Sequence, residues 1–173
     1  IENFVALSNG ELIDNPGFLV KSEKHLKHLQ RNLSRKKKRS KNRLKSRLQL
    51  ARYHLKISDQ RLDFLHKTSS HLSDEYSYIV VEDLKIKNMV SHPRLAKHIH
   101  DSSWNTFIRM LSYKAVIGGG VVEKVNPKNT SNKCSNCLKK VYMPLSNREL
   151  HCPSCGFVCD RDVNAAVNIF HRR

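Results

Sequence analysis

Tyr78-Ile79-Val80-Val81-Glu82-Asp83 is the stretch of sequence that decides the fold class. Its continuous apolar, β-branched run is typical of a central strand that is buried on both faces. A carboxylate directly after such a strand is costly to bury unless something compensates its charge, and a divalent cation is one candidate. Glu82 is therefore a candidate metal ligand, whereas simple solvation explains Asp83.

The chain before this strand predicts a β-hairpin followed by a helical hairpin. Residues 4–7 and 11–20 alternate apolar and polar side chains around Ser8-Asn9-Gly10, a sequence suited to a tight turn. Over residues 21–73, leucines recur at spacings of three, four and seven, which predicts two helices that pack along a coiled-coil-like seam. The expected seam residues are Leu26, Leu29, Leu33, Leu44, Leu48, Ala51, Leu55, Leu62, Leu65 and Leu72.

Helices and strands also alternate after residue 83. We expect a helix from about Leu95 to Ala115, ended by Gly118-Gly119-Gly120, and then a strand over residues 121–125. Apolar residues at helical spacing predict a final helix that contains Val163, Ala166, Val167 and Phe170. The sequence therefore predicts an α/β protein whose helices pack on a mixed sheet.

The chain carries a large excess of positive charge. The 32 Lys and Arg residues outnumber the 15 Asp and Glu residues and give a formal charge of +17, far more than solubility requires. Seven of these charges lie between the two predicted helices, at Arg35, Lys36, Lys37, Lys38, Arg39, Lys41 and Arg43. Self-repulsion of this size favours contact with the phosphates of DNA or RNA, and a solvated turn is the alternative. Lys85, Lys87 and Arg161, near the carboxylates, are further candidate contacts.

An anionic membrane surface is the competing polyanion. The single Trp lies outside the basic stretch, and the chain has neither a run of about 18 apolar residues nor the apolar region of a signal peptide. We therefore expect a cytoplasmic protein with no membrane partner, in which cysteines are more often metal ligands than disulfides.

The cysteines form the most specific motif of the chain. Cys134 and Cys137 make one CxxC knuckle, and Cys152 and Cys155 make a second knuckle after 14 intervening residues. Two such knuckles can complete a tetrahedron of thiolates around one zinc ion, which leaves no open position and indicates a structural site. The fifth cysteine, Cys159, is interpreted as a spare buried thiol, and a fifth or alternative metal ligand is the other interpretation.

A second group of carboxylates opens the last helix, in Asp160-Arg161-Asp162. Asp160 is suited to cap the helix, since an Asp side chain accepts the free backbone N–H groups of the first turn. Asp162 is a second candidate metal ligand, and a structural role is its alternative.

Four segments, in order along the chain, resemble the C-terminal half of TnpB proteins. They are residues 80–90 (VVEDLKIKNMV), 101–104 (DSSW) with 113–115 (YKA), 130–137 (TSNKCSNC) and 160–169 (DRDVNAAVNI). TnpB proteins come from bacterial insertion sequences and are relatives of miniature type V CRISPR effectors. The resemblance implies a RuvC-like nuclease domain of the RNase H fold over residues 1–126 and 160–173, with a zinc ribbon inserted at 127–159.

The same resemblance implies a function. In this family a guide RNA directs the cleavage of DNA, and three acidic residues hold two Mg²⁺ ions. Motif by motif, Glu82 corresponds to the second acid and Asp162 to the third. Hard carboxylates suit Mg²⁺, and such metal pairs activate a water and stabilise the leaving oxygen.

The chain departs from the family at its beginning. The first acid belongs to a strand that reads roughly Gly-Ile-Asp-Leu-Gly, and residues 3–8 match the family segment immediately after that strand, so the 173 residues do not contain that Asp. We therefore expect this chain to cleave poorly or not at all. Two hypotheses remain open: the nuclease half of an RNA-guided DNA endonuclease linked to transposition, or a nuclease-dead remnant that only binds RNA or DNA.

Overall fold

Two antiparallel strands open the chain. The computed structural model describes residues 2–89, 91, 93–144 and 147–172, except the side chains at positions 87 and 93–95. Strand β1 (Asn3–Ala6) pairs with β2 (Leu12–Asp14), and Gly10 takes the positive φ of 97° that the turn needs. The second strand is shorter than predicted, because Pro16 has no N–H for the ladder and Gly17 adopts a left-handed conformation directly before a helix.

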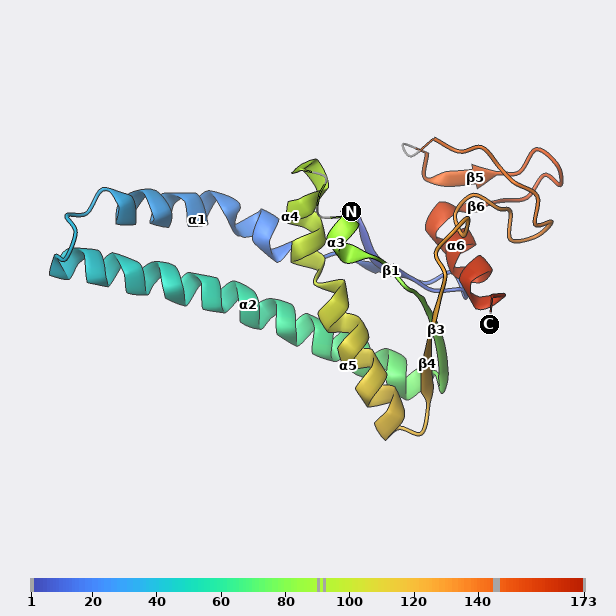
Figure 1. Ribbon diagram of the computed structural model, residues 1–173, viewed down its shortest axis with the longest axis horizontal. Helices are drawn as coiled ribbons and strands as arrows, with labels where there is room; N and C mark the ends of the chain where they lie inside the picture. The colour runs from blue at the N-terminus through green and yellow to red at the C-terminus, as the bar shows by residue number, and fades with distance from the viewer. Residues whose placement is uncertain (1, 90, 92, 145–146, 173) are drawn as a thin grey trace.

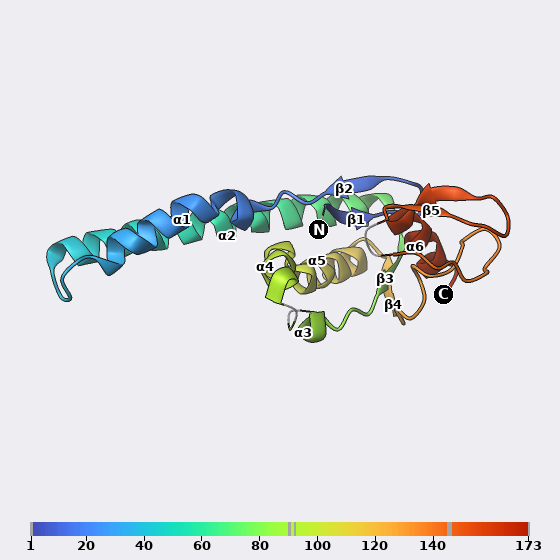
Figure 2. The same ribbon diagram turned by 90° about the horizontal axis from the view of Figure 1, so that it is seen from above.

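The next two elements form a long arm. Helices α1 (Phe18–Ser34) and α2 (Lys41–Glu75) lie side by side and extend away from the rest of the molecule (Figures 1 and 2). Leu26 of α1 and Ile57 of α2 are buried. The predicted helical hairpin is therefore present, although α1 begins at Phe18 and α2 ends at Glu75.

The predicted leucine seam is only partly correct. Leu65 and Leu72 are buried, but four predicted seam leucines closer to the tip of the arm on α2 are exposed: Leu44, Leu48, Leu55 and Leu62. At about 100° per residue, these four leucines share one stripe, while Leu65 and Leu72 lie roughly 60–80° away from Leu44 around the helix axis. The stripe therefore turns away from the face of α2 that is buried at Ile57 and Leu65.

Strands β3 (Tyr78–Glu82) and β4 (Val121–Val125) form a parallel pair in register from Tyr78↔Val121 to Glu82↔Val125. Gly120 allows this pairing to begin, because a Cβ atom there would lie 2.6 Å from the carbonyl oxygen of Ser77. Within the described residues the strands form three separate two-stranded sheets, and β3 is only partly buried. The expected single mixed sheet with a central strand buried on both faces is therefore not observed.

The predicted helix over residues 95–115 is two helices. After the short α3 (Ile86–Met89), α4 (Pro93–Ser102) and α5 (Trp104–Ile117) meet at Ser103, which has a left-handed backbone with φ 53°. The hydroxyls of Ser102 and Ser103 bond to the carbonyls of His98 and His100, and these local bonds compete with a continuous helix. As predicted, α5 ends at the glycines.

One apolar core joins these elements. Phe4, Leu65, Leu72, Phe107, Met110 and Leu111 form its buried centre. Ile79, Val81 and Val122 pack against this centre from the parallel strands. Alternation along β3 therefore directs Val80 and Glu82 to the opposite face of the sheet.

The remaining residues form a second unit beside this core. Strand β5 (Glu149–His151) pairs with β6 (Val158–Asp160), and helix α6 (Arg161–Phe170) follows at once. Figure 1 shows β3 and β4 between α5 on one side and α6 on the other. The residues of α6 contact β3, β1 and the β5–β6 pair. This last helix therefore joins the two units.

A buried ion pair fixes the arm to the core. Asp101 at the end of α4 is buried. Its carboxylate accepts a hydrogen bond of 2.7 Å from Nη2 of Arg61 on α2 and one of 2.9 Å from the backbone N–H of Leu19 on α1. Asn15 donates to the neighbouring Ser102 hydroxyl. One carboxylate therefore ties together three helices.

This arrangement gives a stability prediction. Asp101→Ala should lower the free energy of unfolding by about 3 kcal/mol, since removing one partner of a buried pair leaves the other charge uncompensated. The matched control is Asp63→Ala, which breaks an exposed ion pair with Lys67 and should cost under about 0.5 kcal/mol. Urea denaturation of both variants measures the difference, and equal losses would show that Asp101 is not a special anchor.

Candidate functional site

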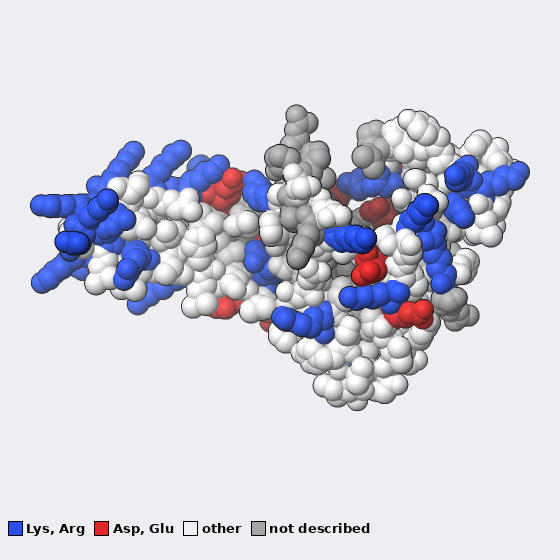
Figure 3. All heavy atoms as spheres, viewed as in Figure 1, with Lys and Arg blue, Asp and Glu red and all other residues white. Residues whose placement is uncertain are grey.

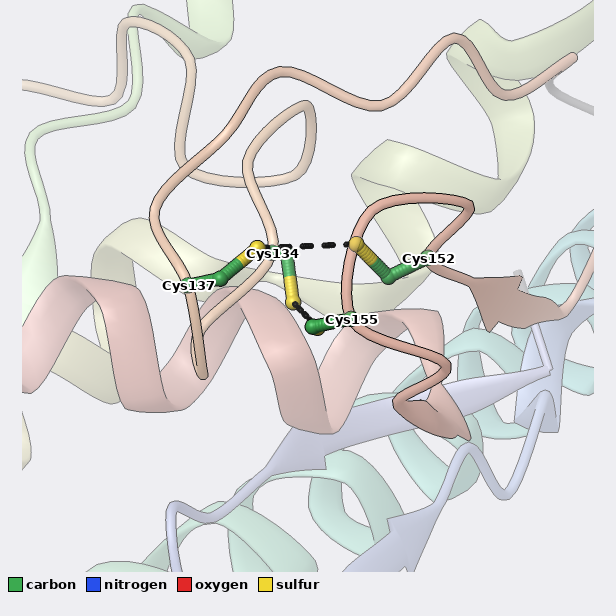
Figure 4. Close-up of side chains that lie close together, drawn as sticks. All are labelled: Cys134, Cys137, Cys152 and Cys155. Carbon is green, nitrogen blue, oxygen red and sulfur yellow. Dashed lines mark hydrogen bonds between the residues drawn. The ribbon is translucent and has the colours of Figure 1, made fainter.

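Four cysteines converge at one point of the second unit (Figure 4). The sulfurs of Cys134, Cys137, Cys152 and Cys155 all lie within 4.8 Å of one another, with 3.7 Å between Cys134 and Cys155 and 3.6 Å between Cys137 and Cys152. Zinc–sulfur bonds of about 2.3 Å in a tetrahedron would put the sulfurs roughly 3.8 Å apart. The two predicted CxxC knuckles therefore form one cluster whose spacing suits a tetrahedral metal ion.

The backbone of each knuckle follows the same course. The carbonyl of Cys134 accepts the N–H of Leu138 at 2.8 Å, and the carbonyl of Cys152 accepts the N–H of Gly156 at 2.9 Å. Both residues that close the turn are left-handed, with φ 61° at Leu138 and 70° at Gly156. Glycine suits this conformation in the second knuckle, and the first knuckle places a leucine in the same conformation.

Two thiols of the cluster differ in acidity. The backbone N–H of Phe157 stabilises the thiolate of Cys155 and lowers its pKa to about 6. The backbone N–H of Lys139 also favours the thiolate of Cys137, but burial and the neighbouring cysteine sulfurs outweigh it and raise the pKa to about 11. Four thiolates this close repel one another, and a bound cation removes that repulsion.

Cys159 stands apart from this cluster. It is half-buried, packs against the small core of the second unit and is absent from the group of four. Burial raises the pKa of its thiol, which keeps it protonated and unreactive. This agrees with its interpretation as a spare thiol.

Glu82 ends β3 and faces away from the main core. Its Oε1 accepts a hydrogen bond of 2.5 Å from the hydroxyl of Thr130, which is buried at the start of the cysteine segment. This bond fixes one carboxylate oxygen and leaves the other for a different partner.

Asp162 lies in the first turn of α6. As predicted, Asp160 caps this helix, since its Oδ1 accepts the backbone N–H groups of Asp162 and Val163 at 2.7 and 3.1 Å. The Asp162 carboxylate lies 3.7 Å from Nη1 of Arg148 and 3.5 Å from Nε of Arg161. These two guanidinium groups partly offset its negative charge.

The two candidate acids come from elements in contact, because α6 packs against β3. In the described part of the chain, the four cysteines are the one set of three or more His, Cys, Asp or Glu side chains with metal-binding geometry. Glu82 and Asp162 are only a pair, whereas a set of this kind contains at least three such side chains.

Four side chains near this site escaped the sequence reasoning. Thr130 carries the bond to Glu82, and the buried Asn164 and Asn168 of α6 bond to the backbone of the first knuckle. The four-residue spacing of two asparagines on one face of an otherwise apolar helix was the available signal. Arg148 could not be identified, because its contact with Asp162 depends on the fold of the second unit.

The basic residues gather at the free end of the arm, as Figure 3 shows. Arg35, Lys36, Lys37, Lys38, Arg39 and Lys41 are exposed there. Arg43 differs, because its guanidinium donates to the carbonyls of Leu33 and Lys36 and so closes the turn between the helices.

The other predicted phosphate contacts lie elsewhere. Lys85 is exposed just after β3, and the side chain of Lys87 is outside the described part of the chain. Arg161 is largely buried and bonds to the carbonyl of Asn147. Among the described helices, none combines the length and the apolar character that a membrane crossing requires.

Known proteins resemble this chain along nearly its whole length. A protein of Streptomyces pristinaespiralis with the name "Putative RNA-guided DNA endonuclease" is 42% identical over 171 residues, which are 98% of this chain and 42% of that protein. InsQ of Escherichia coli K12, which bears the same name, is 35% identical over 98% of this chain and 46% of its own length. The chain therefore spans less than half the length of these relatives.

A solved structure and a further relative agree with these matches. The cryo-EM structure of a Cas12f1–sgRNA–target DNA complex superposes with a TM-score of 0.66 over 92% of this chain and 43% of that chain, at 19% identity. At this identity the likeness shows the fold alone. A TnpB-like protein of Methanocaldococcus jannaschii is 37% identical over 118 residues, 64% of this chain and 42% of that protein.

Two family models divide the chain between them. The Cas12f1-like TNB domain model matches residues 104–169, which include all four clustered cysteines. The model of the probable transposase family OrfB_IS605 matches residues 1–92, more than half of the chain. With TnpB-like proteins among its relatives, as its motifs predicted, the chain belongs to the OrfB_IS605 probable transposase family.

Proposed function

We propose that this chain is the nuclease portion of an RNA-guided DNA endonuclease linked to transposition, and that Glu82 and Asp162 are its metal-binding acids. One observation carries the proposal: α6, whose first turn holds Asp162, packs against β3, which ends at Glu82. The names of the relatives and the fold shared with Cas12f1 support it at the level of the family.

The proposed architecture is a RuvC-like domain of the RNase H fold over residues 1–126 and 160–173, with a zinc ribbon inserted at 127–159. Two separate cores support this division. The larger core draws its buried residues from Phe4 to Leu111, and the smaller core draws its members from Cys134 to Cys159. Helix α6 then returns to β3 and β1.

The proposed ion of the ribbon is zinc. All four ligands are thiolate donors at tetrahedral spacing, so the site is closed and its role is structural. Apart from two cysteines, Val141 and Leu150 form the buried centre of the ribbon among its described residues, so we propose that metal binding contributes much of its folding energy. Reduced cysteines of this kind fit a cytoplasmic location.

Cys134→Ser should remove the bound zinc and unfold the ribbon, because three thiolates and a hydroxyl hold the ion poorly. Elemental analysis of purified protein should give about one zinc ion per chain for the parent and much less for the variant. Cys159→Ser is the matched control, a cysteine of the same core outside the cluster, and should keep its zinc. Equal zinc loss in both variants would contradict the assignment.

At the carboxylates, the chain supplies fixed oxygen ligands of the kind that Mg²⁺ prefers. Thr130 orients Glu82 through its hydroxyl, and the capped first turn of α6 orients Asp162. The chemistry that paired Mg²⁺ ions supply at such sites is activation of a water and stabilisation of the leaving oxygen. The first acid of the family pattern is not among these 173 residues, so we propose that they cleave DNA poorly by themselves.

A cleavage assay tests this proposal and its alternative. A form of the chain extended upstream through the Gly-Ile-Asp-Leu-Gly segment should cleave single-stranded DNA with Mg²⁺, faster than the 173 residues do. Glu82→Gln in the extended form should lower the rate more than about 100-fold, since even residues that only support metal ligands are worth 10–100-fold.

Glu123→Gln is the matched control for this assay, because Glu123 also lies on a parallel strand and bonds to a hydroxyl, that of Tyr78. It should leave the rate within about twofold. Cleavage that survives Glu82→Gln would contradict the metal assignment. An extended form that binds nucleic acid without cleaving it would favour the alternative, a nuclease-dead binding protein.

DNA and a guide RNA are the proposed partners, and the tip of the arm is the proposed contact with their backbone. Six of its seven basic side chains are exposed, and no acidic residue occurs between positions 35 and 43. Phosphates would relieve the mutual repulsion of these charges.

Replacing Lys37 and Lys38 by Gln should weaken binding to all single-stranded sequences alike. The slope of log K against log salt should fall in magnitude by about 1.4, since each lost phosphate contact removes about 0.7. The matched control replaces Lys27 and Lys67, whose charges are already paired with Glu23 and Asp63. Fluorescence anisotropy at several salt concentrations measures both pairs, and an equal change in the control would contradict a specific role of the tip.

A further inference from the structure

Helix α6 holds the cysteine segment through two buried amides. Asn164 is fully buried; its Oδ1 accepts the N–H of Ser135 at 2.8 Å and its Nδ2 donates to the carbonyl of Lys133 at 2.7 Å. These partners are the residues on either side of Cys134. The asparagine therefore binds the backbone of the first knuckle where it carries a clustered sulfur.

Asn168 extends this contact by one turn of the helix. Its Nδ2 donates to the carbonyl of Lys133 at 2.8 Å and to the carbonyl of Thr130 at 2.9 Å. Residues four apart lie on the same face of a helix, so both amides point at the same segment. Sliding or rotating α6 would leave buried carbonyls and amides unpaired, which is costly.

Thr130 completes the connection to the sheet. Its carbonyl is held by Asn168, and its hydroxyl donates to Glu82 at 2.5 Å. The threonine is buried, so water does not replace either bond readily. A continuous path of direct hydrogen bonds therefore runs from α6, which carries Asp162, through the start of the cysteine segment to Glu82.

We propose that Asn164, Asn168 and Thr130 are positioning residues that set Glu82 and Asp162 relative to one another, with the folded ribbon as their template. This inference rests on the proposed function, because it concerns the same two acids. Metal binding by the cysteines orders the segment between Thr130 and Ser135, and that ordered segment fixes both the register of α6 and the orientation of the Glu82 carboxylate.

A merely structural role for these residues makes a different prediction. If the amides and the hydroxyl only stabilised the fold, a variant that stays folded and keeps its zinc would bind divalent cations at the carboxylates as the parent does. If they position the acids, a folded variant with full zinc content would still bind these cations more weakly.

The test uses the 173-residue chain loaded with zinc and titrated with Mn²⁺. Paramagnetic broadening of the backbone N–H signals of Asp83 and Val163, the neighbours of the two acids, reports cation binding there. Thr130→Val removes only the hydroxyl; it should keep about one zinc ion per chain and weaken Mn²⁺ binding about 10–100-fold, as is common for groups that orient metal ligands. Thr130→Ser, which restores a hydroxyl, should return the affinity to within about threefold of the parent.

The asparagines are tested in the same way. Asn168→Leu should release zinc faster to a chelator and also weaken Mn²⁺ binding. It removes the bonds to the carbonyls of Lys133, next to the first clustered cysteine, and of Thr130, which holds Glu82. Asn105→Leu, at an exposed position of α5, is the matched control and should change neither measurement.

Two outcomes overturn the inference in distinguishable ways. If Thr130→Val binds Mn²⁺ like the parent while Glu82→Gln loses binding, the acids form the site but are not positioned by the threonine, and the proposed function stands. If Glu82→Gln itself leaves Mn²⁺ binding unchanged, the proposed metal site fails and the inference fails with it.

Discussion

The rest of the C-terminal unit depends on the convergence of four sulfurs within 4.8 Å. Among the described residues, the segment around them buries few apolar side chains, and its strands β5 and β6 are three residues each. A unit of this size cannot offset its own conformational entropy by burial alone. Without the proposed zinc cross-link at the cysteines, α6 would have no ordered surface for Asn164 and Asn168, and Thr130 would have no fixed place beside Glu82.

The positive charge of the chain is divided between two environments. At the tip of the arm, Lys36, Lys37 and Lys38 are exposed and lack nearby acids, so their field extends into solvent and attracts polyanions. Beside α6, Arg148 and Arg161 face Asp162 and the backbone, so their charge is compensated locally. The net charge of +17 therefore overstates the positive charge that the region around Asp162 offers to a phosphate.

Local sequence signals predicted local structure well. The CxxC spacing predicted the cysteine cluster, and an Asp at the start of the last helix predicted the capping bonds of Asp160. Residues 121–125 form β4 as expected. The failures arose where distant contacts decide. The predicted long helix is interrupted at Ser103, next to Asp101 and Ser102, which bond to residues far away in the chain. The exposed Leu44 stripe shows that leucine spacing alone does not identify the buried face of α2. Likewise, the pairings of Thr130 and Arg148 join residues far apart in the chain.

The cysteine cluster and the proposed acidic site differ in burial. Cys134 is completely buried, which suits thiolates that keep one ion for the lifetime of the fold. The Asp162 carboxylate is about a third exposed, with 36% of its side-chain surface accessible, so ions and a phosphate backbone can reach it from solvent. An acid on an exposed loop would have no fixed position, whereas this one stands on a helix whose own buried amides, those of Asn164 and Asn168, bond to the backbone of the cysteine segment. The chain thus obtains a fixed acid at an open surface, because the rigid contacts of the same helix lie about half a turn and nearly two turns further along it.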